Sequence, residues 1–314
     1  MKLPGPWLRF ALVLGIAWSG LALAGDDSAL YWKVLRDGKT AGYLLGTIHS
    51  EDPRVLDFSQ HFVDELESNQ MFAMEMVPNL PTMARLTEYM QYPDGTTLES
   101  QVGPERFARL KSVLSAYQVP PGWIDHMKVW AVMMTLSVPP PETGFFMDFS
   151  LSLRAAGAGL EVVGLETLEQ QLAFLENMPM EFQLALLDNA LDEYDRVDAI
   201  HSQMVDCYLE GDLAVLKQLS ADQMQQLPAE AGQYFMAQGI DARNLRMVAA
   251  LAPRFDGGRV FTAVGALHLP GEHGLVALLR ARGFELEPLP MPFSAPQGGG
   301  QAGDEGGCKK GDAP

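Results

Sequence analysis

The sequence predicts an α/β protein with a mixed central sheet flanked by helices and a largely helical insertion or cap. Short apolar runs typical of buried strands lie near both ends of the chain, whereas helical periodicity fills its middle. Two of these runs, residues 41–45 and 260–264, are each followed by a Gly-x-x-His motif. Strands that alternate with helices favour a sheet with helices packed on its faces.

The N-terminal half supplies a hairpin and two strands. A hairpin is expected over residues 31–48, with its turn at Asp37-Gly38, followed by a helix over 59–68. The apolar run at 71–76 predicts a strand that Pro78 ends. Residues 81–137 have a helical pattern, broken near residues 93–95 and 120–122 by Pro and Gly. A helix over 148–156 and a strand over 159–164 follow.

The C-terminal half is helical until the sheet resumes. Long helical patterns occupy residues 168–238, broken at Pro179 and Gly211, and another helix is expected over 241–252. The apolar run that begins at Val260 predicts a strand. A helix over 271–282 and a final strand over 284–289 complete the expected elements.

The ends of the chain indicate export. Residues 1–24 have the properties of a signal peptide: Lys2 and Arg9 supply positive charge, an apolar stretch of fourteen residues follows, and Ala22-Leu23-Ala24 is a cleavage site. One domain is predicted over residues 25–292, with a Gly-rich, disordered tail over 293–314. The sequence leaves open whether its two cysteines, Cys207 and Cys308, pair with each other.

The charge and hydrophobicity of the chain limit the classes of molecule that it is expected to bind. Without Lys2 and Arg9 the chain has 20 basic and 40 acidic residues, a formal charge of −20. Such a charge disfavours nucleic acid and anionic lipid. No other segment is long and apolar enough to span a bilayer, so no stable membrane anchor is expected after cleavage. A periplasmic or secreted protein is predicted, and its oligomeric state is left open.

Three side chains are candidates for a shared site. His49 and His268 close the two Gly-x-x-His motifs, each where a predicted strand ends. Ligands of open α/β sheets bind in the crevice beyond the strand ends. Glu75 interrupts the apolar run at 71–76, and burying a carboxylate is costly unless it is paired, protonated or bound to a metal. An edge strand with Glu75 facing water is the alternative.

Taken in order, these segments resemble the TraB/GumN family, which includes the Tiki-type proteins. The resemblance covers roughly residues 30–289 and rests on residues 43–49, the strand that carries Glu75, residues 164–171, Arg243-Asn244, and residues 265–271. It implies a metal-dependent hydrolase in which the paired motifs and an acidic residue form the site. Tiki-type members are described as divalent-metal proteases.

The chemistry of such a site follows from its residue types. His49, His268 and Glu75 would hold a divalent metal ion, with Mn, Co or Zn as candidates, and leave positions open for water and substrate. Glu166 follows another predicted strand and is interpreted as a further ligand or a general base. Arg243 would stabilise an oxyanion or bind a substrate carboxylate, with Asn244 orienting it.

The expected function is an exported divalent-metal-dependent hydrolase, most simply a peptidase, acting on a peptide or small-molecule substrate. The alternative is a non-catalytic periplasmic binding protein for a peptide, haem or metal ligand, because such a protein would use the same residues. Two departures from the family stand out. Tiki-type and TraB-type members are commonly attached to membranes, whereas no spanning segment is expected in this chain. Ala242 stands directly before Arg243, where an acidic residue is common in the family.

Export predicts a defined mature N-terminus. Mass spectrometry of the protein recovered from the periplasm should find Gly25 as its first residue, because cleavage follows the small residue Ala24. Protein from that compartment that still carries Met1 would contradict the prediction.

Overall fold

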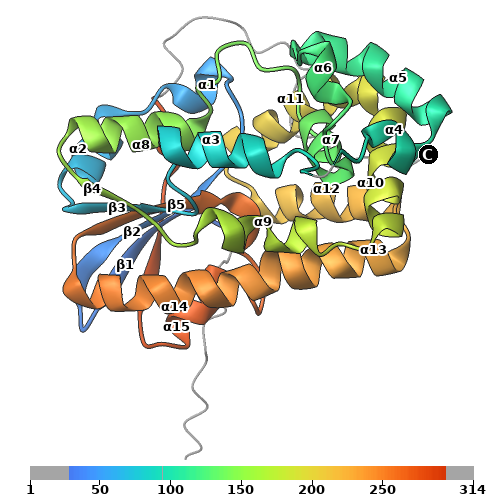
Figure 1. Cartoon of the computed structure of the whole chain (residues 1–314). Helices are drawn as coiled ribbons and strands as arrows, with labels where there is room; N and C mark the ends of the chain where they lie inside the picture. Colours follow the sequence, from blue (N-terminus) through green and yellow to red (C-terminus); the bar gives the residue numbers. More distant parts are fainter. Residues whose placement is uncertain (1–27, 94, 295–314) are drawn as a thin grey trace, which may run out of the picture.

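The computed structural model describes residues 28–93 and 95–294, which form a six-stranded mixed sheet with helices on both faces (Figure 1). The strands are β1 (Tyr31–Arg36), β2 (Lys39–Thr47), β3 (Met71–Met74), β4 (Glu161–Gly164), β5 (Val260–Gly265) and β6 (Glu285–Leu289). Their order across the sheet is β4-β3-β5-β2-β1-β6. The first four are parallel, whereas β1 is antiparallel to both β2 and β6. The predicted fold class is confirmed.

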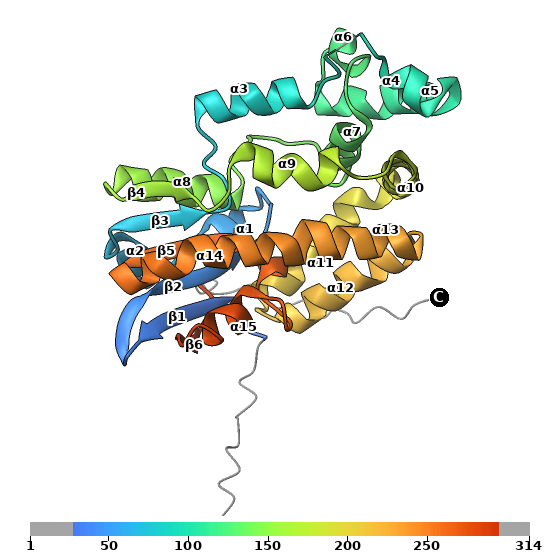
Figure 2. The same ribbon diagram turned by 60° about the horizontal axis from the view of Figure 1, so that its bottom comes forward.

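Helices make up most of the rest of the described chain. They are α1 (Pro53–Leu56), α2 (Gln60–Glu67), α3 (Leu80–Tyr89), α4 (Leu98–Val102), α5 (Pro104–Leu114), η1 (Ser115–Tyr117), α6 (Pro121–Ile124), α7 (Val129–Leu136), α8 (Met147–Gly157), α9 (Leu168–Glu176), α10 (Met180–Asp192), η2 (Tyr194–Arg196), α11 (Val197–Leu209), α12 (Leu213–Gln225), α13 (Ala229–Tyr234), η3 (Phe235–Asp241), α14 (Ala242–Gly257), η4 (Ala266–His268) and α15 (Leu275–Arg280). α8 packs on β3 and β4, and α14 packs on β1 and β2 from the opposite face (Figures 1 and 2).

The apolar residues form two cores. The larger one surrounds the sheet and includes Phe72 and Phe261, both fully buried on neighbouring strands. The second lies within the cap, between α5, α7 and α10, and includes Leu110, Trp130 and Leu187. Burial of each such side chain stabilises the fold by about 1.5–3 kcal/mol. The helical middle of the sequence therefore folds around a core of its own.

The hairpin and the strand that precedes Glu75 illustrate how the sequence sets local structure. Asp37 and Gly38 have φ angles of 51° and 69°, as a type I′ turn between twisted strands requires. β3 ends at Met74, so Glu75 follows the strand instead of lying inside it as predicted. β3 lies between β4 and β5, which also excludes the edge-strand alternative.

The helix break expected between residues 238 and 241 is absent. α13, η3 and α14 follow one another without interruption from Ala229 to Gly257, and the seven residues of η3 are π-helical. A π-helical stretch rotates the following residues relative to an α-helix and is frequent at functional sites. Here it immediately precedes Arg243, one of the predicted site residues.

Several expectations fall on residues outside the described range. These are the signal peptide over 1–24, nearly all of the tail over 293–314, and the partner proposed for Cys207, namely Cys308. Phe293, at the start of the predicted tail, still belongs to the fold, because it forms a β-bridge with Phe58. None of the helices in residues 28–93 and 95–294 is long and apolar enough to cross a membrane.

The packing of β2 against β5 predicts that Gly42 cannot be replaced. A Cβ at Gly42 would lie 1.9 Å from the Val260 carbonyl oxygen, so Gly42→Ala must push the two central strands apart. The free energy of unfolding in urea should fall by about 3 kcal/mol, the upper part of the range for overpacked cores. Gly122→Ala is the matched control because its Cβ meets no atom within 4 Å, and equal stability of the two variants would refute the prediction.

Candidate active site

The carboxyl ends of the four parallel strands bring the predicted site residues to one edge of the sheet. Thr47 of β2 pairs with Gly265 of β5, and Met74 of β3 pairs with both Ala263 of β5 and Gly164 of β4. Glu75, Glu166, His49 and His268 each follow one of these strands by one to three residues. The strand register therefore places all four at the same edge, where ligands of open α/β sheets bind.

Two of these residues are carboxylates that share one guanidinium. Arg243 donates from Nη2 to Glu75 Oε2 at 2.5 Å and to Glu166 Oε2 at 2.7 Å, and from Nε to Glu166 Oε2 at 2.8 Å. Arg246, one turn further along α14, reaches Glu166 Oε1 at 3.2 Å. The Glu166 side chain has no exposed surface and that of Arg243 is 7% exposed. Charges this deeply buried persist only when they are paired and hydrogen-bonded.

Glu75 is held ionised. Burial by itself raises the pKa of this carboxyl, but the charges of His268 and Arg243 and hydrogen bonds from Gly265 N–H and Arg243 outweigh it and lower the pKa from 4.5 to about 2. Burial is also the main cause that lowers the pKa of His268, so this imidazole is neutral at neutral pH and Arg243 supplies the lasting positive charge. Glu75 is thus an anion beside a neutral imidazole.

Asn244 fixes which ring nitrogen of His268 is available. Its Nδ2 donates to the His273 carbonyl at 2.8 Å, which turns its Oδ1 toward His268 Nδ1 at 2.6 Å. Because an amide oxygen can only accept, the proton of the neutral ring lies on Nδ1. His268 Nε2 therefore has a lone pair and faces Glu75 Oε1 at 3.7 Å. Asn244 orients His268, not Arg243 as the sequence analysis expected.

The glycines of the two motifs allow close backbone approach. Gly265 donates its N–H to Glu75 Oε1 at 2.9 Å, and a Cβ there would lie only 3.3 Å from that oxygen. A Cβ at Gly46 would lie 3.1 Å from the Ala266 Cα and 2.7 Å from a Leu269 methyl carbon. The two Gly-x-x-His motifs thus pack directly against each other, and neither glycine could carry a side chain without displacing its neighbours.

His49 lies apart from the other candidates. Its ring stacks on Phe146 at 3.8 Å, its Nδ1 lies 3.8 Å from Asp148 Oδ2, and its side chain is 59% exposed. Asp148 also accepts a hydrogen bond from Thr47, and His201 Nε2 lies 3.2 Å from the His49 carbonyl oxygen. Within the described residues His49 forms no hydrogen bond or ion pair with Glu75 or His268.

Two of the three predicted metal ligands, His268 and Glu75, are close enough together to bind one divalent ion. Two ligands of one ion, each about 2.1 Å from it, lie at most about 4.2 Å apart, and the 3.7 Å between His268 Nε2 and Glu75 Oε1 meets that limit. A third protein ligand is not in place, since no group of three or more His, Cys, Asp or Glu among residues 28–93 and 95–294 is arranged to hold a metal. The exposed His49 ring is the next candidate, because it follows β2, the strand beside β5.

Two predicted roles do not agree with the partners that the structure gives these side chains. Both oxygens of Glu166 accept from arginines and its side chain is fully buried, so it has no free lone pair facing the edge for a metal or a water proton. Arg243 donates to carboxylates instead of facing a substrate. Both residues hold Glu75 in place.

Sequence reasoning missed three neighbours of the site. Arg246 could have been found, because residues three apart on a helix share a face with Arg243. Gln171, whose Nε2 lies 3.3 Å from Glu75 Oε2, was part of a segment noted for its family resemblance but was given no role. Asp148 gave no signal, since its proximity to His49 comes from the packing of α8 against the loop after β2.

The model of the TraB/PrgY/gumN family matches residues 30–288, which include all of the sheet except Leu289 and every residue of this site. The chain belongs to this family. The predicted resemblance is thereby confirmed.

Relatives within the family include enzymes and proteins without an assigned activity. Metalloprotease TIKI1 of Danio rerio is 23% identical over 317 residues, covering 84% of this chain and 64% of that protein. The protein YbaP of Escherichia coli (strain K12), described as uncharacterized, is 24% identical over 246 residues, covering 76% of this chain and 87% of YbaP. The chain spans less than two thirds of TIKI1. No solved structure matches this chain.

Because Arg243 pairs with two carboxylates, replacing it should lower the free energy of unfolding by an amount that depends on pH. The folded-state pKa of Glu75 lies below its unfolded value, so this ionised carboxyl stabilises the native protein above about pH 4.5, and the contribution is lost as the pH falls toward 2. Arg243→Met removes the partner and should lower the free energy of unfolding at pH 7 by about 3–5 kcal/mol, and by less at about pH 3, where part of this contribution is already lost in the wild type.

Arg246→Met is the matched control. Arg246 is 39% exposed and reaches only Glu166, so its loss should cost about 1 kcal/mol or less. Chemical denaturation of both variants and the wild type at the two pH values measures the difference. A cost for Arg243→Met that does not shrink at the lower pH would show that the pairing with Glu75 does not cause it.

Proposed function

We propose that the chain is an exported divalent-metal-dependent hydrolase that cleaves peptide bonds. The single observation that carries the proposal is the distance of 3.7 Å between His268 Nε2 and Oε1 of the ionised Glu75. The hydrogen bond with Asn244 places the ring proton on Nδ1 and so leaves the lone pair of Nε2 free. A neutral imidazole and a carboxylate at this separation are the start of a catalytic metal site. Relatives named metalloproteases support the same direction.

His268 and Glu75 would hold the ion, and His49 would complete the set by rotating away from Phe146 and Asp148. The exposure of the His49 ring leaves room for that rotation. When bound, the ion makes hydroxide available from water near neutral pH and polarises a carbonyl oxygen. Its identity among Mn, Co and Zn is left to experiment.

The surrounding residues prepare the two inner ligands. Arg243 keeps Glu75 ionised, while Gly265 N–H fixes the direction of the oxygen that faces His268. Asn244 holds His268 in the tautomer with Nδ1 protonated. Glu166 anchors Arg243 from behind. Such fixed partners raise metal affinity, and their loss commonly weakens it about 10–100-fold.

The cellular setting of the proposal comes from the sequence. The leader over residues 1–24 would direct the protein to the periplasm or the outside of the cell. The net charge of the mature chain would keep nucleic acid and anionic membranes away from the site. Exported polypeptides are the substrates that this setting offers.

Metal content and peptide hydrolysis test the proposal together. The wild type, loaded with Mn, Co or Zn, should bind one equivalent of metal by elemental analysis and hydrolyse members of a peptide library. His268→Ala and Glu75→Gln should lose both properties because each removes one ligand. His49→Ala should abolish hydrolysis, and Asn244→Ala should weaken metal affinity about 10–100-fold.

His61→Ala is the control, since its side chain is 82% exposed on α2 and pairs with Glu65 and not with any proposed ligand. It should retain wild-type metal content and activity. Metal content and hydrolysis that persist in both His49→Ala and His268→Ala would refute the metal mechanism. Metal binding without hydrolysis of any peptide or ester would favour the binding-protein alternative.

A further inference from the structure

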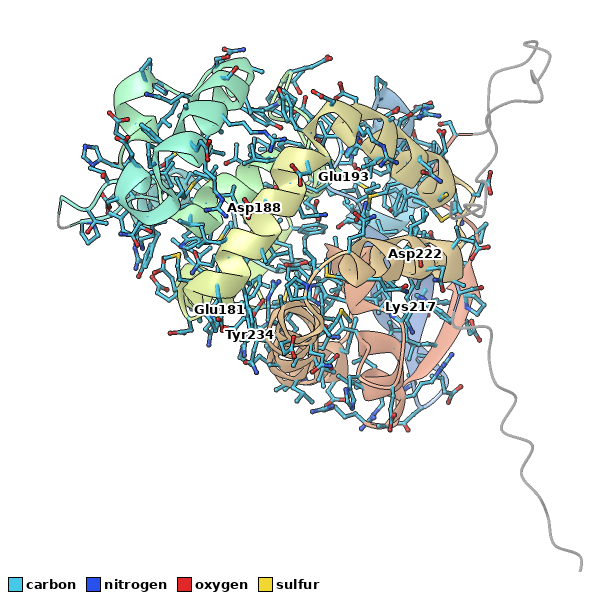
Figure 3. All side chains as sticks on the ribbon, turned by 90° about the vertical axis from the view of Figure 1, so that its right-hand side faces the viewer. Glu181, Asp188, Glu193, Lys217, Asp222 and Tyr234 are labelled. Atoms are coloured by element: carbon cyan, nitrogen blue, oxygen red, sulfur yellow. The ribbon has the colours of Figure 1, made fainter. Side chains whose placement is uncertain are left out.

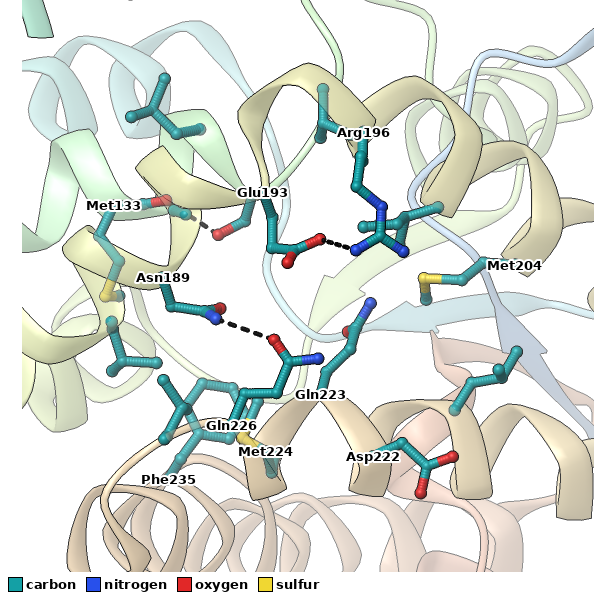
Figure 4. A pocket seen from close by; sticks show the side chains of 18 of the residues that line it. Met133, Asn189, Glu193, Arg196, Met204, Asp222, Gln223, Met224, Gln226 and Phe235 are labelled. Atoms are coloured by element: carbon teal, nitrogen blue, oxygen red, sulfur yellow. Dashed lines mark hydrogen bonds and ion pairs between the residues drawn. The ribbon is translucent and has the colours of Figure 1, made fainter. Parts of the chain in front are cut away.

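A cavity of about 380 Å³ opens in the helical part of the molecule, away from the strand-end residues described above. α7, α10, α11, α12 and η3 line it. Figure 3 shows this side of the protein, with Glu193, directly after α10, above Asp222 on α12, and Figure 4 shows the cavity from close by. Its volume is within the range of small-molecule and peptide side-chain pockets.

The walls of the cavity are mainly apolar and adaptable. Four methionines line it, Met133 and Met134 from α7, Met204 from α11 and Met224 from α12. Methionine side chains are flexible and polarizable, so they fit around apolar groups of different shapes and are common on surfaces that accept many sequences. The cavity lies between the two cores, because Met204 packs against the sheet core and Met133 belongs to the cap core.

Half of the polar side chains that line the cavity are carboxamides, namely Asn189, Gln203, Gln223 and Gln226. Asn189 on α10 donates from Nδ2 to Gln226 Oε1 at the end of α12 at 3.3 Å, and Gln223 lies one turn before Gln226 (Figure 4). Each carboxamide both donates and accepts, which matches the N–H and C=O groups of a peptide backbone.

The charges of the cavity disfavour an anion. Arg196 pairs with Glu193 at 2.9 Å, which neutralises both, and Asp222 adds a carboxylate. No uncompensated positive charge lines the cavity, so a phosphorylated ligand or a fatty-acid carboxylate would find no partner there. A neutral or basic apolar ligand fits better.

Two series of contacts connect the cavity with the strand-end site. Phe235 in the cavity wall packs edge to face on Phe174 with ring centroids 5.7 Å apart, and Phe174 lies against Gly239, whose carbonyl oxygen is 3.5 Å from Arg243 Nη1. On α11, Ile200 lines the cavity and the adjacent His201 contacts the His49 carbonyl. Intervening residues therefore connect the cavity wall with both halves of the proposed site.

We propose that this cavity binds an apolar segment of a polypeptide substrate, with side chains against the methionines and backbone groups on the carboxamides. The assignment of the bound segment as substrate rests on the proposed peptidase function. The binding itself does not, because no group of the cavity is a proposed metal ligand. Selection of apolar peptides would then be a property of the cap and not of the strand-end residues.

Binding of labelled peptides without metal tests the proposal. The probes are two fluorescein-labelled decapeptides, one with Leu, Phe and Met at alternate positions among Ser and Gly, the other with Ser at those positions. In EDTA, fluorescence anisotropy should show the wild type binding the apolar peptide at least tenfold more tightly than the Ser peptide. Gln223→Trp fills the cavity and should weaken binding of the apolar peptide at least tenfold.

Gln225→Trp is the matched control, the same substitution on an exposed position of α12 that does not line the cavity, and it should bind within twofold of the wild type. Ala190→Leu, a smaller change in the cavity wall, replaces Gln223→Trp if that variant fails to fold by circular dichroism. Undiminished binding in a folded cavity variant, or preference for a medium-chain fatty acid over the apolar peptide, would overturn the proposal. Hydrolysis without such binding would refute only this inference, and binding without hydrolysis would refute only the proposed function.

Discussion

The site depends on two carboxylates, Glu75 and Glu166, that share the guanidinium of Arg243. These charges come from the ends of two parallel strands and from the helix that covers the sheet. None could be buried alone, because removing one partner of such a group leaves an uncompensated charge. Their pairing fixes α14 against the ends of β3 and β4 and keeps Glu75 ionised beside His268. The position of Arg243 follows in turn from the π-helical stretch that delivers it.

The two Gly-x-x-His motifs have different environments although their sequences match. His268 is buried and its tautomer is set by Asn244, whereas His49 is exposed and stacks on Phe146. The two glycines are constrained by different neighbours, because a Cβ at Gly46 would meet Ala266 of the other motif, whereas a Cβ at Gly265 would meet the Glu75 carboxylate. If both bind the proposed metal ion, the buried His268 would hold it in a fixed position and the exposed His49 would have to turn toward it.

The two cores support different parts of the molecule, the strand-end site and the apolar cavity. The sheet core holds the strand ends and therefore the ionisable groups of the site. The cap core holds α7 and α10, which form much of the apolar cavity. α11 connects the cavity with the strand-end site, since Ile200 lines the cavity and His201 contacts the loop that carries His49. In the proposed function the strand ends would supply the chemistry, and the cap would select the ligand.

The sequence by itself determined the strands, the helical cap and the set of residues that gather at the strand ends. Apolar runs, turn residues and the repeated motif are local signals, so they were readable without contacts. The tertiary structure decided the partners of those residues. Asn244 orients His268, two arginines pair with Glu166, and His49 lies beside Asp148. These pairs are 24 to 99 residues apart in the chain. No local pattern encodes such distances, because strand register and helix packing set them.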